Sequence, residues 1–424
     1  AAVFEKLDDA WRFAHDRLRE AVLNDLAPVE RAALHRQVAQ GIEAAYPASS
    51  AHAELLTDHW YAAGDIAKSV QYTLLAAPYL LNSVNNYRRA QQLLERVLDH
   101  TADVIPSQRA HLHCLLGETF GNFAMYDDAI AHYALCLQDA GDDDKLQVEA
   151  LCHTSRALER QGKLDAAAQH TQRALAIVTA RPDPANGVLV QISQANLAYT
   201  QGDLARAQAY NAQSLAYYRA QGNQFDTVRI LNNLGMIAHD QRDYPLALTY
   251  YAESLTLCDT ISAIFLQSMT QGNIGLVQYS QGQYANACAN LEQALKLQRQ
   301  IGNRWAIAAG LTNLVFTYTA LGNLDAARRH LGEGLALAYA IGVPAMVVEL
   351  VVGAAWLRLK QGDAVYGAQL LGMAEAHPAM SDEIKALWYD GLLADFSVAL
   401  DTTTFATAQA AGAAFDFDAT VAAL

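Results

Sequence analysis

The chain has 424 residues, more than a single core needs, so we expect several domains or an array of repeats. Apolar residues make up 52% of it and charged residues 17%, which excludes a disordered chain, and the formal net charge of −15 disfavours direct contact with nucleic acid or an anionic membrane surface. Five scattered cysteines without a C-x-x-C pair predict reduced core thiols in a cytoplasmic protein, and no apolar run is long enough to span a bilayer.

Residues 1–50 do not follow the pattern of the rest of the chain. From Trp11 they read WRFAHDRLREAVLNDLAPVERAALHRQVAQGIEAAYP. Within this stretch, residues 13–21 (FAHDRLREA) resemble the M-H-D motif of STAND-type signalling ATPases, with Ala14 in place of Met and with His15 and Asp16 matching. The resemblance implies a short helical remnant, the C-terminal part of that family's winged-helix segment.

The same resemblance gives His15 a role in the intact protein only. In the family this histidine contacts the β-phosphate of bound ADP, and an imidazole N–H can donate to a phosphate oxygen. The chain has no G-x-x-x-x-G-K-[ST] loop, so we expect no cofactor, and ATP or ADP only in a full-length protein. The nucleotide-binding domain is expected before residue 1. In this chain alone, His15 would only pack or cap a helix.

A period of forty residues governs most of the remaining chain. The positions that mark it are Gly162, Gly202, Arg242, Gly282, Gly322 and Gly362. A period of this length predicts a solenoid of helix pairs, and glycine suits the left-handed turn that ends the first helix of each pair. Upstream, residues 51–107 have the pattern of degenerate helices of the same type.

Two further columns hold small side chains where the helices of a pair should cross. The first column consists of Ala167, Ala207, Ala247, Ala287, Ala327 and Gly367, and the second of Ala174, Ser214, Ser254, Ala294 and Gly334. A larger side chain at these positions would keep the two helices apart. The columns therefore predict closely packed antiparallel helices.

These columns resemble the tetratricopeptide repeat (TPR). Residues 115–137 (LLGETFGNFAMYDDAIAHYALCL) also fit its pattern, with Gly117, Ala129 and Tyr133 in the expected places. The repeat is about six residues longer than the standard 34, a variant familiar in bacterial signalling proteins. The resemblance implies an all-α fold: a right-handed superhelix of about seven repeats over residues 108–376, followed by capping helices over residues 377–424.

The resemblance places the first helix of each repeat on a concave face, which in such proteins binds peptides, helices or domains. The positions it predicts for this groove are Arg156, Asn196, Tyr199, Arg229, Asn232, Asn233, His239, Asn273, Tyr279, Asn313 and Trp356. Three of them, Asn233, Asn273 and Asn313, occupy the same repeat position, and we call them the Asn ladder. Amides can donate to and accept from the main chain of a ligand, although they can also bond only to neighbouring helices.

The other clusters of polar residues are better explained by a structural role than by metal binding or catalysis. His111 and His113 stand two apart on a helix and face different ways, and no second group with zinc-ligand spacing follows them. No G-x-S-x-G nucleophile motif occurs. We therefore expect neither a metal site nor enzyme activity.

The leading functional prediction is a sensor module. In it, a protein or peptide partner, or a small inducer, occupies the groove and regulates a STAND-type ATPase. A constitutive scaffold for a protein complex and a receptor for a small inducer are the alternatives. The sequence leaves the identity of the ligand, the effector domain and the oligomeric state open.

Overall fold

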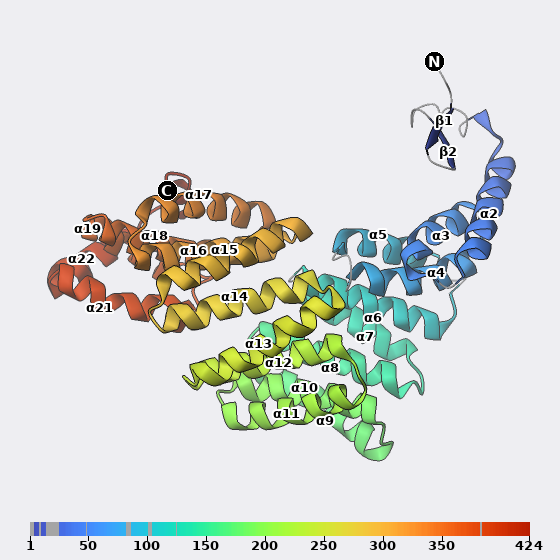
Figure 1. The fold of residues 1–424 in the computed structure, drawn as a ribbon, viewed down its shortest axis with the longest axis horizontal. Coiled ribbons are helices and arrows are strands. Elements are labelled where there is room, and N and C mark those ends of the chain that lie inside the picture. Colours follow the sequence, from blue (N-terminus) through green and yellow to red (C-terminus); the bar gives the residue numbers. More distant parts are fainter. Residues whose placement is uncertain are drawn as a thin grey trace. The chain divides into compact units, whose positions relative to one another are not determined.

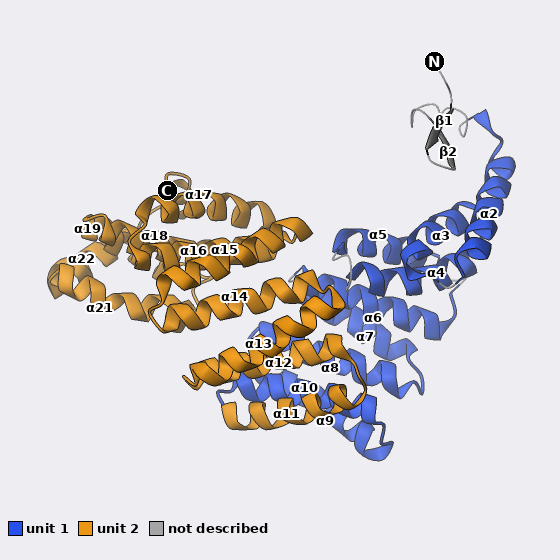
Figure 2. Cartoon of the chain, viewed as in Figure 1, with its two compact units in different colours: residues 1–203 blue, residues 204–424 orange. Residues whose placement is uncertain are grey.

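The structure is a computed structural model. It describes residues 25–47, 49–81, 86–100, 104–123, 125–381 and 384–424, and the backbone alone of residues 4–7 and 10–13. The chain divides into two compact units, unit 1 (Ala1–Asp203) and unit 2 (Leu204–Leu424), shown in Figure 2.

A β-hairpin lies where the sequence predicts a helical remnant. Strands β1 (Phe4–Leu7) and β2 (Ala10–Phe13) pair in antiparallel fashion, and helix α2 (Pro28–Ala45) follows them. Aromatic and charged residues alternate along β2, which is the period of two expected of a strand. His15 lies outside the described residues, so its role and the winged-helix assignment stay predictions.

Unit 1 continues with helices that pack in consecutive pairs along the chain (Figure 1). They are α3 (Ser50–Ala62), α4 (Ile66–Tyr79), α5 (Tyr87–Leu98), α6 (Pro106–Asn122), α7 (Tyr126–Asp139), α8 (Asp144–Arg160), α9 (Leu164–Ala180) and α10 (Pro184–Thr200).

Unit 2 repeats the same arrangement and ends with shorter helices. Its elements are α11 (Leu204–Ala220), α12 (Gln224–Asp240), α13 (Tyr244–Ile261), α14 (Ile264–Ser280), α15 (Tyr284–Ile301), α16 (Arg304–Leu321), α17 (Leu324–Ile341), α18 (Pro344–Lys360), α19 (Ala364–Ala376), the π-helix η3 (Lys385–Tyr389), α21 (Asp390–Ala399), α22 (Thr402–Gly412) and α23 (Phe417–Val421). The predicted all-α, TPR-like solenoid is confirmed, and the N-terminal hairpin is the departure from it.

The turn positions adopt the conformation that the period predicts. All five glycines of the turn column have positive φ, from 73° at Gly162 to 92° at Gly362, and Arg242 has φ of 62°. Because a side chain makes this conformation unfavourable, Arg242 keeps the common turn at a cost in backbone energy.

The predicted crossing columns are also confirmed. Ala167, Ala207 and Ala247 are fully buried, and Ser254 in the second column is buried as well. An equally close approach joins two glycines to tyrosine rings of the following helix. A Cβ added at Gly117 would lie 2.6 Å from the Tyr133 ring, and one added at Gly235 would lie 2.5 Å from Cζ of Tyr251. These positions exclude any side chain.

The five cysteines, Cys114, Cys136, Cys152, Cys258 and Cys288, are free and buried, as the sequence predicts for core thiols.

At the C-terminal end of unit 2, the backbones of α22 and α19 cross in direct contact. A Cβ at Gly372 would overlap the carbonyl of Gln409, and one at Gly412 would overlap the carbonyl of Gln369. In the described part of the chain, no helix is both long enough and apolar enough to cross a bilayer.

Candidate partner-binding site

The first helices of successive repeats in unit 2, α12, α14, α16 and α18, pack one beside the next (Figure 1). Asn223 and Asn303 cap α12 and α16, because their side chains accept from Asp226 N at 3.1 Å and Ala306 N at 3.0 Å. We call the surface at the predicted groove positions the first-helix face. It consists of the predicted residues Arg229, Asn233, His239, Asn273 and Asn313, together with Met236, Met269 and Leu276, which stand one or more repeats away from other predicted residues.

The Asn ladder runs along this face on α12, α14 and α16. The Asn233 Nδ2 donates to Asn211 Oδ1 at 3.3 Å, and the Asn273 Nδ2 donates to Asn232 Oδ1 at 3.2 Å. All three ladder residues are partly exposed. A primary amide has two N–H donors and two acceptor lone pairs, so each of these bonds leaves capacity for a ligand.

Asn232, which the sequence also places in the groove, lies in the interior. Its side chain is 2% exposed, and its Nδ2 donates to Ser254 Oγ and Thr270 Oγ1, both at 2.9 Å. The same Nδ2 also lies 3.0 Å from the Val228 carbonyl oxygen, so its two N–H donors are shared among three acceptors. This amide bonds to polar groups of three helices, α12, α13 and α14, and is not accessible to a ligand.

The first-helix face carries little charge. Helix α14 contains no charged residue, and Arg304, at the start of α16, is the charged residue of that helix. Apolar side chains are exposed instead: Met236 is 37% exposed and Met269 is 40% exposed. Exposed methionines adapt to differently shaped ligands. The surface therefore offers amide groups and flexible apolar contacts.

The two basic residues predicted on α12 already have partners. Arg229 Nη1 lies 3.0 Å from Asp226 Oδ1 on the same helix. His239 Nε2 lies 2.8 Å from Ser280 Oγ, and its ring lies beside that of Tyr244. Both side chains remain at least partly exposed at one edge of the face.

Tyr279 and Trp356, two other predicted groove residues, are covered by the chain itself. Trp388 of η3 lies edge-on to Tyr279, with ring centroids 5.9 Å apart. The Trp356 Nε1 donates to Asp395 Oδ2 of α21 at 2.8 Å. Burial raises the pKa of the Tyr279 hydroxyl well above its ordinary value, with smaller contributions from Tyr284 and Asp395. The C-terminal segment thus closes this end of the face.

Arg156, Asn196 and Tyr199 belong to the first helices α8 and α10 of unit 1 and are partly exposed. Helix α8 is strongly charged, with Glu149, Arg156 and Glu159 at groove positions. Burial raises the pKa of Glu159 to about 7, although a hydrogen bond from Ser155 Oγ at 3.0 Å opposes this shift.

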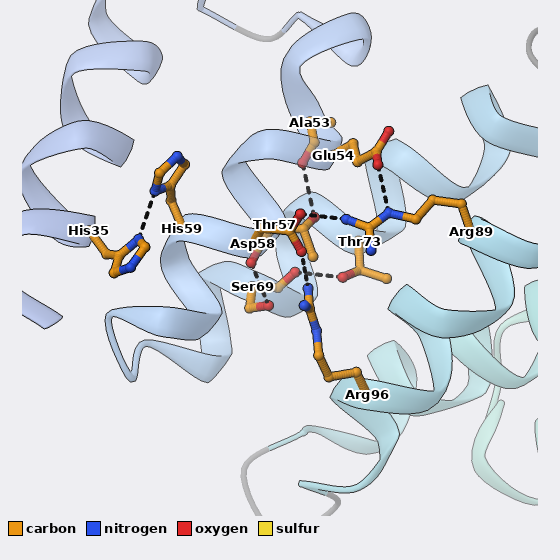
Figure 3. A network of polar contacts seen from close by, with 10 residues as sticks. All are labelled: His35, Ala53, Glu54, Thr57, Asp58, His59, Ser69, Thr73, Arg89 and Arg96. Carbon is orange, nitrogen blue, oxygen red and sulfur yellow. Dashed lines mark hydrogen bonds and ion pairs between the residues drawn. The ribbon is translucent and has the colours of Figure 1, made fainter. Parts of the chain in front are cut away.

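Polar contacts hold α2 against the first helices of the array. Glu43 accepts from Trp60 Nε1 at 2.9 Å, from Lys68 Nζ at 3.0 Å and from Tyr72 OH at 2.8 Å. His35 Nδ1 lies 2.9 Å from His59 Nδ1 (Figure 3). These links fix α2 to α3 and α4.

The charged side chains of the cluster in Figure 3 are paired with one another. Arg89 bonds to both Glu54 and Asp58, and Arg96 Nη2 donates to Asp58 Oδ1 at 2.7 Å. Opposite charges are thus matched between α3 and α5, and the cluster stabilises the packing of these two helices.

Within the described ranges no group of three or more His, Cys, Asp or Glu is placed to hold a metal ion. His113, considered with His111 for zinc, pairs with His132 at 3.0 Å.

Part of the repeat region matches a known protein family. Residues 189–260 and 266–340 match the model of the tetratricopeptide repeat family. The chain therefore contains TPRs, a fold that generally serves protein interaction. No curated protein sequence matches the chain.

Two solved structures share the fold over most of the chain. One is a STAND protein (Signal Transduction ATPase with Numerous Domains) with a tetratricopeptide repeat sensor, from Pyrococcus horikoshii: the TM-score is 0.56 at 16% identity, covering 93% of this chain and 58% of that one. The other is a Rap protein complexed with competence and sporulation factor: the TM-score is 0.58 at 14% identity, covering 84% of this chain and 99% of that one. The chain thus spans little more than half the length of the STAND protein.

Proposed function

We propose that this chain is a ligand-sensing TPR array that binds a protein or peptide through the first-helix face of unit 2. The observation that carries the proposal is the Asn ladder, three partly exposed amides at one repeat position beside exposed methionines, on helices of which α14 has no charged residue and α16 has Arg304 alone. Main-chain groups of an extended peptide need such donors and acceptors, and uncharged side chains fit such a surface.

The expected ligand is an uncharged or weakly charged segment of polypeptide. Burying an ionised side chain of the ligand against α14 would leave that charge without a partner. The free energy lost by removing the charge from water would then exceed the free energy gained from the other contacts. The Rap structure, which shares the fold and is complexed with competence and sporulation factor, supports ligand binding by analogy of fold.

We further propose that binding regulates a STAND-type ATPase to which the array is joined in a cytoplasmic protein. Support comes from the sequence of residues 13–21 and from the fold shared with a STAND sensor. The tight attachment of α2 through Glu43 supplies a rigid link for such coupling. A ligand can shift that equilibrium only by its difference in affinity between the two states.

The test is selection of peptides from a random twelve-residue phage-displayed library on the full chain. We expect the selected peptides to be poor in charged residues. Their affinity should fall at least tenfold in an Asn233→Ala/Asn273→Ala double variant, since each lost hydrogen bond contributes about 1 kcal/mol. The matched control is Asn286→Ala on α15, whose amide bonds to Gln283 at an exposed site.

Two outcomes would contradict the proposal. Selection of highly charged peptides would move the site to the charged helices of unit 1. Affinity unchanged in a folded double variant would remove the Asn ladder from the site. If a small molecule from a metabolite panel binds instead, with the same loss in the double variant, the inducer-receptor alternative replaces the peptide ligand. Binding that does not alter the ATPase of a full-length protein would favour the scaffold alternative.

A further inference from the structure

We propose that the aromatic cluster of Tyr279, Phe316 and Trp356 is a second protein-binding surface, made for an amphipathic helix and occupied here by the chain's own η3–α21 segment. The two surfaces adjoin, but this inference does not depend on the Asn ladder. It is built on the way that Trp388 and Asp395 contact three first helices of the array.

Trp388 provides the apolar half of the contact. Its ring stacks on Phe316 of α16, with centroids 3.8 Å apart and planes 8° apart, and lies edge-on to Tyr279 of α14. Phe316 is fully buried beneath it, whereas most other first-helix residues at the groove positions are partly exposed. The position that Trp388 fills is thus part of the groove that TPR proteins use for ligands.

Asp395 provides the polar half, seven residues further along. It accepts from Trp356 Nε1 at 2.8 Å and lies 2.8 Å from Lys360 Nζ. The contact with Lys360 and the one with Trp356 hold the pKa of Asp395 below its ordinary range, so the carboxylate stays charged at neutral pH. Lys360 also lies over the Trp356 ring, 5.5 Å from its centroid. Trp356 and Lys360 thus recognise one acidic side chain.

The segment packs apolar residues into the core but leaves one polar group unsatisfied in the described part of the chain. The indole Nε1 of Trp388 is buried, yet it has no hydrogen-bond partner among the described residues, although tryptophan N–H groups normally find one when buried. Trp388 lies on a π-helix, a form that is rare and frequently marks functional sites. Two large apolar side chains on the outer side of the segment are open to solvent, with Leu387 58% and Val398 90% exposed.

The contacts define the partner that the surface would take. A helix needs an aromatic residue for the Trp388 position, a leucine four residues later, as at the buried Leu392, and an acidic residue three beyond that. Residues at these spacings lie along one face of a helix. The chain's own segment is held at a high effective concentration, so an external helix binds only when that segment is weakened or outcompeted.

The experiment measures binding of a fluorescent peptide with the sequence of residues 384–400 to the full chain. We expect weak binding to the unmodified chain and binding about tenfold tighter to the Asp395→Asn chain, because the internal copy loses a charged hydrogen bond that the added peptide keeps. Adding Lys360→Gln to that chain should abolish the gain. Val398→Ala, on the exposed side of the same helix, is the matched control and should change nothing.

Native-state hydrogen exchange of the unmodified chain gives a second readout that needs no variant. We expect amides of residues 384–399 to exchange faster than those of α16 and α18, through local release of the segment. Equal protection of all three would overturn the proposal, as would a folded Asp395→Asn chain that binds the peptide no better than the unmodified one. A concentration-dependent dimer of the Asp395→Asn chain would show that the occupant is a second copy, and would overturn the assignment to a partner helix.

Discussion

The first helices α8 and α14 hold the same place in their repeats, in unit 1 and unit 2, but present opposite chemistry. Where α8 carries Glu149, Arg156 and Glu159, α14 carries Met269, Leu276 and Tyr279 at the corresponding columns. The crossing columns beneath them stay small in both units. Helix packing and ligand chemistry are therefore encoded at different positions of the same repeat.

The difference has an energetic side. A carboxylate such as Glu159 loses hydration when it is partly buried on α8, whereas the side chains of α14 contain nothing to desolvate beyond neutral polar groups. Binding of a ligand to an uncharged groove therefore loses less free energy to desolvation than binding to a charged groove. Three sets of substitutions test whether the two units share the packing beneath this surface and differ in the chemistry of the surface itself.

The largest effect is expected from the glycines that lie against tyrosine rings. Gly235→Ala in unit 2 and Gly117→Ala in unit 1 should each destabilise the chain by about 2–3 kcal/mol, because the new methyl group would overlap a buried ring. Urea unfolding followed by circular dichroism measures this. Gly332→Ala and Gly187→Ala, helical sites with no neighbouring atom within 4 Å, are the controls and should be neutral or slightly stabilising. A loss in one unit alone would show that the two cores pack differently.

The second prediction concerns the pH dependence of stability, to which Glu159 of α8 contributes and the uncharged α14 does not. The folded chain holds the Glu159 proton more tightly than the unfolded chain, because the pKa is raised from 4.5 to about 7. Its contribution to stability is therefore complete below about pH 4.5 and is lost as the pH rises through about 7. Glu159→Gln should match the unmodified chain near pH 4.5 and exceed its free energy of unfolding by about 1–2 kcal/mol at pH 8, a value discounted for partial exposure.

Tyr279→Phe, at the corresponding column of unit 2, is the control for that titration, and the pH dependence of its stability should follow the unmodified chain between pH 4.5 and 8. Urea unfolding at several pH values measures both variants. A Glu159→Gln chain with no gain at pH 8 would mean that the carboxylate is as well solvated in the folded chain as in the unfolded one.

The smallest effect concerns the turn that both units share. Arg242→Gly should stabilise the chain by about 0.5–1 kcal/mol, since glycine adopts the left-handed conformation without the cost of a side chain. Thermal unfolding measures the change, and Gly282→Ala should shift the midpoint in the opposite direction. Stabilisation by both substitutions would contradict the role of backbone conformation at this column.

The sequence predicts the parts of the fold that repeat. The turn column with Gly162 and the crossing column with Ala247 depend on local geometry that recurs every forty residues, so a pattern in one repeat is supported by the others. The hairpin over residues 4–13 has no such support, because it occurs once. Asn232 was expected beside Asn233 in the groove, but one residue along a helix turns the side chain by about a quarter turn, which places it in the interior.

The covered end of the first-helix face could not be predicted in the same way. Tyr279 and Trp356 stand at groove positions by repeat pattern, and only the return of η3 and α21 closes them off. The signal that exists is the spacing of Ile384, Trp388, Leu392 and Phe396, an apolar residue at every fourth position. Such a stripe predicts an amphipathic helix but does not say which surface the helix covers.

Because all five thiols are buried, their rates of chemical modification can report local opening of the chain. A buried thiol reacts with an added disulfide reagent only while its surroundings are open, so its rate reports the equilibrium for that opening when reclosing is fast. Cys114, Cys136 and Cys152 lie in unit 1, and Cys258 and Cys288 lie in unit 2. Peptide mapping of the modified thiols after timed exposure would therefore read the opening of each unit separately, in the unaltered protein, with and without a bound ligand.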